Sequence, residues 1–458
     1  MPAFVLVQPR EHSREESTVV IEYRNLRVAV LGGGSVGSQV ASLLITHGDE
    51  LAARAGAGLE VVGIAVRNVD APRDTDIPKH LLTTDAEALI LGADIVVELM
   101  GGLEPARTLI LQALHSGADV ITANKALLAT HGPELFEAAE QVGAQLYYEA
   151  AVGGAIPIIR PLRDSLAGDR VIRILGIVNG TTNYILDRMD TEGDSLESAL
   201  AEATRLGYAE ADPTADVEGF DAAQKAAILA SLAFHTTMPL EAVHREGMTT
   251  VTHEQVVAAR KAGYVVKLLA ICERITDAAT GVEGVTARVH PALIPLSHPL
   301  AAVHGANNAV FVEAEAAGSL MFYGAGAGGV QTASAVLGDV VSAARRHVAG
   351  GPGVAESTQA NLPVLPMSSV ITRYQITMTV VDEPGVLAAV ATQFSDRGVS
   401  VEAVSQSVRD GGDAERPTAT LVIVTHRAEE SSLAATVTSL AASPVVSSVV
   451  SVLRVEGQ

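Results

Sequence analysis

The chain has one cysteine, no tryptophan and few other aromatic residues in a length of 458 residues. Because Cys272 stands alone, an intrachain disulfide and a cysteine metal cluster are excluded, and a reducing compartment is favoured. No apolar run reaches the ~18 residues that a membrane-spanning helix needs. Basic residues are in deficit, 31 against 53 acidic, and the net charge of −22 opposes binding to nucleic acid or anionic membrane. We therefore expect a cytoplasmic protein that binds neither.

The length predicts about three domains. A charged N-terminal extension, residues 1–25, lacks the apolar core of a signal peptide. Over residues 26–150, buried apolar runs alternate with helical patterns, which predicts a Rossmann-type α/β domain on a parallel sheet. The expected strands are Leu26–Leu31, Leu59–Val66, Ala93–Leu99, Ala118–Thr122 and Ala144–Glu149, and the expected helices are Val36–Ala53, Pro105–Ser116 and Pro133–Val142.

A mixed α+β domain is expected over residues 151–323, followed by a helix over 324–348 that returns to the first domain. The glycine- and proline-rich stretch 349–369 is typical of a linker. Residues 370–458 show the order βαββαβ of a small ferredoxin-like unit. The clearest elements of the α+β domain are the strands Val171–Val178, Tyr264–Ile271, Gly284–Val289 and Ala309–Ala314 and the helices Leu196–Leu206 and Glu218–Phe234.

A glycine motif lies between the first strand and the first helix. Gly32, Gly34 and Gly37 form G-x-G-x-x-G, with Ser35 and Val36 inside it. Glycines in this place allow a tight turn and a close approach of backbone to a pyrophosphate, which the helix N-terminus also attracts. A plain glycine turn is the alternative, but the surrounding strand and helix favour a nicotinamide dinucleotide as the cofactor.

The residue after the second strand bears on which dinucleotide binds. NAD-binding units often have an acidic residue there, whereas this chain has Arg67, whose cation suits the 2′-phosphate of NADP. A solvated surface arginine is the alternative, and NAD remains possible. Met100, Gly101 and Lys125 follow later strands and are expected to line the same cleft, because ligands lie beyond the carboxyl ends of parallel strands.

The densest group of polar residues runs from Gly207 to Lys225. Asp221 and Lys225 are four positions apart and share a helix face. A hydride transfer that turns a carbonyl into an alcohol needs a proton donor and positive charge at the oxygen, and a lysine beside a carboxylate supplies both. The alternative is an ordinary surface ion pair next to a solvated acidic loop.

Taken together, these segments resemble homoserine dehydrogenase. The resemblance covers about residues 26–348 and rests on six motifs in order, which makes it far more specific than a lone glycine pattern. They are Val30–Gly37, Thr122–Lys125, Glu149–Pro157, Asn179–Tyr184, Gly207–Lys225, and Tyr323–Gly328 with Leu337–Asp339. The family reduces L-aspartate 4-semialdehyde to L-homoserine with NAD(P)H, reversibly, on the route to threonine, methionine and isoleucine.

The resemblance also implies roles for single residues. Lys225 is the implied acid and base at the substrate oxygen, with Asp221 beside it and Lys125 between nicotinamide and substrate. Glu210 is the implied partner of the substrate ammonium, and Asp216 is a further substrate ligand.

Two further groups follow from the same motifs. Gly326 and Gly328 are expected at the cofactor. The family holds a monovalent cation, commonly sodium, and the implied ligands are Glu149 and the carbonyls of Val152, Gly154 and Ile156.

The tail is similar to an ACT domain, a unit that often binds amino acids and pairs side by side. The stretch Asp382–Leu387 matches the signature turn, and Asp382, Gly385, Val386 and Leu387 are the expected ligand contacts. By resemblance the effector is L-threonine and the assembly a homodimer or homotetramer. The alternative is a tail that only dimerises.

Two alternatives remain for the whole chain. One is a dehydrogenase of another amino-acid semialdehyde. The other is a non-catalytic protein that senses a dinucleotide and an amino acid. The chain departs from the family pattern at Arg67 and in its N-terminal extension.

Overall fold

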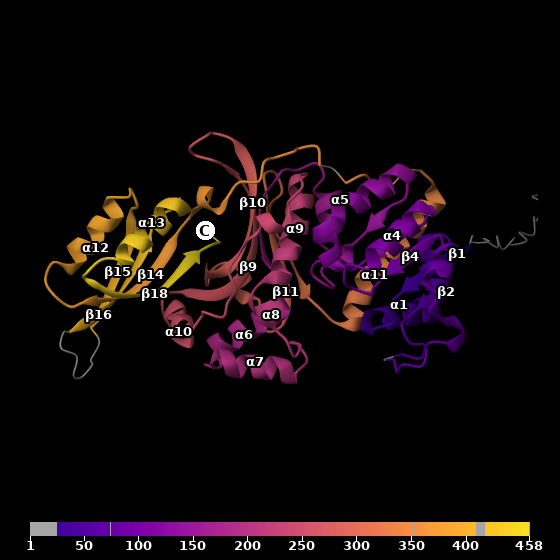
Figure 1. Ribbon diagram of the computed structural model, residues 1–458, viewed down its shortest axis with the longest axis horizontal. Helices are drawn as coiled ribbons and strands as arrows, with labels where there is room; N and C mark the ends of the chain where they lie inside the picture. The colour runs from indigo at the N-terminus through magenta and orange to yellow at the C-terminus, as the bar shows by residue number, and fades with distance from the viewer. Residues whose placement is uncertain (1–24, 74, 352, 357, 409–416, 458) are drawn as a thin grey trace, which may run out of the picture.

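The computed structural model describes residues 25–73, 75–351, 353–356, 358–408 and 417–457. Three α/β units follow one another along the long axis of the molecule (Figure 1). No helix in this part of the chain combines the length and the apolar composition needed to cross a bilayer.

The first unit is built on a six-stranded parallel sheet in the order β3-β2-β1-β4-β5-β6. Its strand order reverses between β1 and β4, the position at which doubly wound sheets bind ligands. Apolar side chains bury both faces of β1, as the continuous apolar run predicts. The strands are β1 (Asn25–Leu31), β2 (Gly58–Ala65), β3 (Leu82–Thr83), β4 (Ile95–Glu98), β5 (Asp119–Thr122) and β6 (Leu146–Tyr147).

Five helices connect these strands, and a sixth, α11 (Gly329–Ala349), returns from far along the chain to pack on α1 (Figure 1). The single helix expected over Val36–Ala53 is wrong. The chain leaves helical geometry at His47, because the next residue, Gly48, has a low helix propensity. Two helices form as a result. The five are α1 (Ser35–Thr46), α2 (Gly48–Ala55), α3 (Ala86–Ile90), α4 (Ala106–His115) and α5 (Lys125–Val142).

The second unit packs helices against a sheet that is antiparallel except for the short strand β8, which pairs with β10 in parallel. Its strands are β7 (Val171–Ile177), β8 (His244–Arg245), β9 (Tyr264–Thr276), β10 (Glu283–Pro295), β11 (Asn307–Ala314) and β12 (Gly318–Ala325). Its helices are α6 (Gly180–Thr191), α7 (Leu196–Arg205), α8 (Thr214–Val217), α9 (Phe220–Phe234) and α10 (His253–Lys261). Strands β9 and β10 pair along their whole length and are longer than expected. Charged residues are the reason at the end of β9, where Glu273 is typical of a loop but pairs with the buried Arg288 at 2.9 Å.

The tail has the order βαββαβ that the sequence predicts. It comprises β14 (Tyr374–Val381), α12 (Val386–Ser395), β15 (Val401–Val408), β16 (Thr418–Thr425), α13 (Glu430–Ala441) and β18 (Val446–Val455). A short ribbon of β13 (Ile371–Thr372) and β17 (Ala428–Glu429) lies beside it. The expected fold class, a Rossmann-type unit, an α+β unit and a ferredoxin-like tail, is confirmed.

The tail is not a separate sheet. β18 pairs in parallel with β10 at Leu293 and Val455, and this joins the second unit and the tail into one ten-stranded sheet. The stretch between them is also tied to the protein: the Val285 N–H donates to the carbonyl of Pro363 at 2.9 Å, and the Ala360 N–H donates to that of His235 at 3.1 Å. We expected a linker over residues 349–369, and its described part makes these fixed contacts.

Candidate active site

The turn between β1 and α1 packs backbone against backbone. Gly32 has a φ of +108°, which favours glycine, and a Cβ at Gly37 would lie 2.0 Å from the Gly32 carbonyl oxygen. The first turn of α1, which begins with Ser35 and Val36, has no side-chain cap, and open space surrounds the Cβ position of Gly34. These N–H groups therefore fit a pyrophosphate.

A second glycine loop meets this turn. Gly328 has a φ of +130° and precedes α11, which also starts without a side-chain cap. A Cβ at Gly329 would lie 2.7 Å from Ser35 Oγ, so the N-termini of α1 and α11 lie side by side. Gly326 packs on Asn308, whose side chain a Cβ would meet at 2.1 Å. The sequence placed Gly326 and Gly328 at the cofactor, and the structure brings their loop to the β1–α1 turn.

The buried carboxylate of Glu98 shapes the ends of β4 and β5. One of its oxygens accepts the N–H groups of Met100 at 2.7 Å and Gly101 at 3.2 Å. The other accepts the Thr122 hydroxyl at 2.7 Å. The amide Nδ2 of Asn124 donates to the Gly102 carbonyl at 2.6 Å. The loops after two neighbouring strands are thus fixed together beside the glycine turn.

Two arginines follow β2. Arg67 is exposed two residues beyond the strand end, at the edge where an adenosine ribose lies in such units. Sequence reasoning missed Arg73, which also lies close: a Cβ at Gly33 would stand 3.4 Å from its Nε. Arg73 donates to the carbonyls of Asn68 at 2.8 Å and Ala71 at 2.7 Å and so shapes the loop. Its position could not be read from the sequence, because loop conformation brings it back.

The polar residues expected to react come together between the first two units. Lys225 Nζ lies 2.7 Å from Asp221 Oδ2 and donates to the Val178 carbonyl at 2.6 Å. Lys125 Nζ lies 3.2 Å from Asp221 Oδ1. Asp221 therefore stands between two ammonium groups that come from different units, because Lys125 begins α5 and Lys225 lies on α9.

Asn179 ties the carboxylates of this cluster together. Its amide Nδ2 donates to Asp216 at 2.7 Å and to Asp221 at 3.0 Å, while its Oδ1 caps α6 through the Thr182 N–H. Sequence reasoning did not assign this role, although the Asn179–Tyr184 motif contains it. The sequence indicates only that Asn179 can cap a helix. It does not indicate that its amide donates to two carboxylates.

Burial and charge pairing shift the pKa values of the carboxyl groups in this cluster in opposite directions. Burial works to raise the pKa of Asp221, but the ammonium groups of Lys225 and Lys125 outweigh it and lower the pKa to about 2. Burial raises the pKa of Asp216, helped by the neighbouring charge of Asp221. Asp221 is thus ionised at neutral pH, and its negative charge lies between the side chains of Lys225 and Lys125.

Glu210 is not part of this cluster. It is exposed on the loop between α7 and α8 and makes no hydrogen bond or ion pair with the described residues. Of the two carboxylates expected at the substrate, only Asp216 lies with Lys225 and Asp221.

The turn expected to hold a cation is tightly built. Gly153 and Gly154 have φ values of +80° and +59°, and a Cβ at Gly154 would lie 2.4 Å from the Gly326 carbonyl oxygen. Val152 and Ile156 are buried beside them. In the described residues, no three or more His, Cys, Asp or Glu side chains converge as metal ligands do. A cation in this turn would therefore rest mainly on backbone carbonyls.

Glu149 uses its carboxylate within the chain. One oxygen accepts the N–H groups of Ile158 at 2.6 Å and Ile159 at 2.8 Å. The other accepts the backbone N–H of Arg160 at 3.0 Å and its Nε at 2.9 Å. A carboxylate has about four acceptor positions, so these bonds leave little capacity for a cation.

The signature turn of the tail has the expected backbone. Gly385 has a φ of +92° and starts α12 without a side-chain cap. Asp382 accepts the Gln406 amide at 3.3 Å, Val386 is buried, and Leu387 is 47% exposed. The uncapped N–H groups and the exposed leucine leave this turn open to a ligand or to a second copy of the tail.

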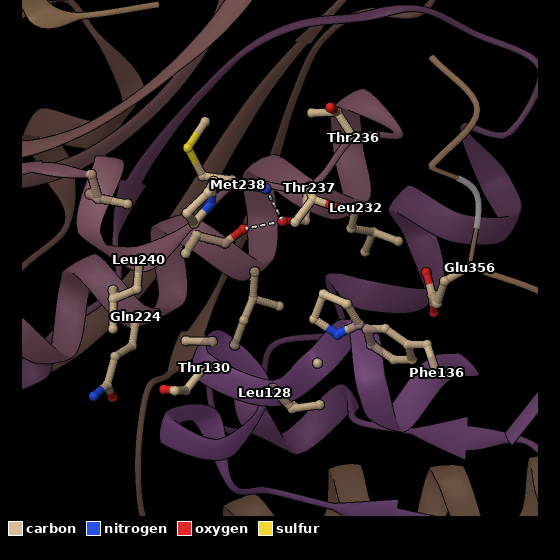
Figure 2. A pocket seen from close by; sticks show the side chains of 18 of the residues that line it. Leu128, Thr130, Phe136, Gln224, Leu232, Thr236, Thr237, Met238, Leu240 and Glu356 are labelled. Atoms are coloured by element: carbon tan, nitrogen blue, oxygen red, sulfur yellow. Dashed lines mark hydrogen bonds between the residues drawn. The ribbon is translucent and has the colours of Figure 1, made fainter. Parts of the chain in front are cut away.

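A cavity of about 800 Å³ lies between α5 and α9 but does not contain the reacting residues. Figure 2 shows Leu128 and Thr130 of α5 across from Gln224 and Leu232 of α9. Its lining includes none of Lys125, Asp221 and Lys225. The chemistry therefore belongs to the cluster and not to this larger cavity.

Comparison with known families agrees with this geometry. Residues 157–341 match the family model "Homoserine dehydrogenase", and residues 32–149 match "Homoserine dehydrogenase, NAD binding domain". Residues 374–444 match "ACT domain". The two larger matches include the glycine turn and the lysine–aspartate cluster.

Relatives span almost the whole chain. A homoserine dehydrogenase of Mycobacterium tuberculosis is 57% identical over 94% of this chain and 97% of its own length. The crystal structure of a homoserine dehydrogenase from Thiobacillus denitrificans has a TM-score of 0.87 at 39% identity, covering 95% of this chain and 99% of the other. A hyperthermophilic archaeal homoserine dehydrogenase in complex with NADPH has a TM-score of 0.59 at 26% identity, covering 72% and 99%.

Proposed function

Because the chain belongs to the homoserine dehydrogenase family, we propose that it catalyses the reversible reduction of L-aspartate 4-semialdehyde to L-homoserine. It is an oxidoreductase with a nicotinamide-dinucleotide-binding unit. This family assignment argues against the alternative of a sensing protein without chemistry. A dehydrogenase of another semialdehyde stays as the second candidate, because no contact among the described residues determines how long a substrate the site accepts.

The observation that carries the proposal is the cluster of Lys225, Asp221 and Lys125 between two units. A bound nicotinamide supplies the hydride to the aldehyde carbon. Lys225 then gives its ammonium proton to the aldehyde oxygen and regains one from solvent. Asp221 holds Lys225 in place, and Lys125 adds positive charge where the alkoxide develops.

The substrate's own charges need partners as well. We assign its ammonium to Asp216 and Glu210. Asp216 is supported by its place beside Asp221. Glu210 rests on the family motif alone, since it is exposed and unpaired with the described residues.

An absorbance assay tests the proposal. Adding L-homoserine and NADP to the enzyme is expected to raise the NADPH absorbance band, and other hydroxy amino acids are expected to give much less. Faster turnover of a different hydroxy amino acid would favour the second candidate, a dehydrogenase of another semialdehyde.

NADP is the proposed preferred cofactor, with NAD possible. The support is Arg67 after β2 and a second cation, Arg73, beside the glycine turn. Arg67→Asp is expected to raise the NADP KM about tenfold or more and the NAD KM far less, because a guanidinium–phosphate contact is a strong charged pair. Arg54→Asp, an exposed arginine on α2, is the matched control. Equal changes in both constants would remove Arg67 from this role.

L-threonine is the proposed effector, bound at the turn of Asp382, Gly385, Val386 and Leu387. Removing the tail is a poor test, since β10 would lose its neighbour β18. Instead, Asp382→Ala is expected to raise the threonine concentration for half-inhibition about tenfold, because it removes a carboxylate from the ligand turn. Turnover without threonine should not change. Asp396→Asn, exposed at the other end of α12, is the control. Unaltered inhibition in Asp382→Ala would favour a tail that only dimerises.

A monovalent cation, sodium by resemblance, is proposed at the carbonyls of Val152, Gly154 and Ile156. Glu149 shapes this turn, because its carboxylate already binds the following backbone N–H groups. A homodimer or homotetramer is the proposed assembly, on the strength of the ACT-domain match alone.

A further inference from the structure

The two carboxylates of the active site lie on either side of one turn. Asp216 is on α8 and Asp221 is in the first turn of α9, and Glu218 and Gly219 connect the two helices. Asn179 binds both carboxylates, at 2.7 Å and 3.0 Å, so their mutual position is fixed only while this turn keeps its shape. A displacement of the turn would move both acids relative to Lys225.

A short segment, residues 244–248, packs against the outside of this turn. The Arg245 guanidinium donates to the Glu218 carbonyl and lies 3.6 Å from the centre of the Phe220 ring. The Met248 N–H donates to the Val217 carbonyl at 2.8 Å. A Cβ at Gly247 would lie 2.8 Å from the same carbonyl oxygen, so no side chain separates the segment from the turn.

The segment is itself held from the other side by the tail. Strand β8 pairs with β10, and the Glu246 N–H donates to the Val289 carbonyl at 2.7 Å. The Glu246 carboxylate binds Arg454 of β18 at 2.9 Å. Arg454 is anchored within the tail, because its Nη2 donates to the buried Glu430 at 2.6 Å and its Nε at 3.2 Å.

We propose that Arg245 is a positioning residue for Asp216 and Asp221. The tail in turn holds the segment of Arg245 through the ion pair of Arg454 with Glu246. The contacts run without interruption from β18 to Glu246, from Arg245 and Met248 to the α8–α9 turn, and from that turn to the acids beside Lys225. The tail therefore contributes to turnover even when no effector is bound.

The alternative is that these partly buried ion pairs stabilise the fold locally and have no bearing on catalysis. The proposal and this alternative predict different values of kcat. Misplacing reacting groups by about 1 Å can lower kcat up to ~100-fold, whereas losing an ion pair that only stabilises the fold leaves kcat unchanged.

The first arm of the test compares Arg245→Ala, Arg245→Lys and the control Arg260→Ala. Arg260 lies on α10, pairs with Asp190 at 3.4 Å and is distant in sequence from the turn. Arg245→Ala is expected to lower kcat about tenfold with the NADPH KM unchanged, as misplaced catalytic groups do. Arg245→Lys should recover most of that loss, because an ammonium can also donate to the Glu218 carbonyl.

Melting temperatures separate positioning from folding in this arm. Arg245→Ala and Arg260→Ala should melt within a few degrees of each other, because each removes one partly exposed ion pair. A kcat within twofold of wild type in Arg245→Ala would overturn the proposal. So would a loss of rate that merely follows the loss of folded protein.

The second arm tests the tail, without any effector. Glu246→Gln removes the charge that binds Arg454 and leaves Arg454 paired with Glu430. It is expected to lower kcat several-fold, whereas Glu241→Gln, exposed nearby, should not. In the double variant Arg245→Ala with Glu246→Gln, the losses should not multiply, because both residues act on one turn. Fully multiplicative losses of kcat, or a wild-type kcat in Glu246→Gln, would show that the tail does not position the active-site residues.

Discussion

Replacing Lys225 with alanine is expected to lower kcat by about 10²-fold or more, with the NADPH KM near its wild-type value. The reason is the position of its ammonium, which is buried between the Val178 carbonyl at 2.6 Å and Asp221 at 2.7 Å. Among the described residues of the second unit, no lysine other than Lys225 pairs with Asp221. Lys125 approaches Asp221 from the far side, at 3.2 Å, and cannot take over the same geometry.

The measurement is steady-state turnover in both directions, with cofactor affinity from fluorescence titration. Lys225→Met is the second variant, because it keeps the buried aliphatic stem and separates loss of the proton donor from loss of packing. Lys261→Ala, exposed at the end of α10, is the control for lysine removal. Near-normal turnover in Lys225→Met would overturn the assigned role.

Gly37→Ala is expected to raise the NADPH KM by at least about tenfold, the next largest effect. Its Cβ would meet the Gly32 carbonyl oxygen at 2.0 Å, and backbone cannot swing aside as a flexible side chain can. Gly32 cannot retreat, since its own Cβ position lies 2.7 Å from the Leu99 carbonyl oxygen. The turn must therefore open, which displaces the N–H groups that face the pyrophosphate.

Cofactor titration of Gly37→Ala against Gly48→Ala checks this expectation. Gly48 starts α2, and nothing lies within 4 Å of its Cβ position, so alanine there should leave cofactor binding unchanged. Equal affinities in the two variants would mean that the β1–α1 turn does not bind the pyrophosphate.

Much of the fold could be predicted because its signals are local. The buried run Leu26–Leu31 followed by G-x-G-x-x-G predicts β1 and the start of α1. The alternation in Tyr374–Val381 and Ala419–Thr425 predicts β14 and β16, and in β16 every second residue is buried. In such segments, the positions that the sequence periodicity assigns to the core are also the positions that the folded protein buries.

The errors arose where distant residues decide the outcome. The end of β9 carries charges such as Glu273 and Arg274, which a sequence pattern assigns to a loop. The end of β10 contains Pro291 and Pro295, and proline is rare inside strands. The pairing of β10 with β18 joins Leu293 to Val455, and no local pattern links two strands so far apart. The tail therefore looked like an appended module.

The candidate site shows the same division. Asp221 and Lys225 share a helix face at a spacing of four residues, so their pairing could be predicted from the sequence. That Lys125 completes the cluster follows from how two units pack, and only the family resemblance indicated it. Asn179 and Arg245 act through contacts with residues far along the chain, which periodicity does not encode.

The place of β18 has a consequence for synthesis of the protein. During translation, the ribosome releases β9 and β10 long before residues 446–455, which supply the strand beside β10. Until then the β10 edge exposes unpaired backbone around Ala292 and Leu293, and open strand edges recruit strands from other molecules. Nascent chains should thus be most prone to aggregation in this interval, and a chaperone that shields open strand edges should raise the yield of folded protein.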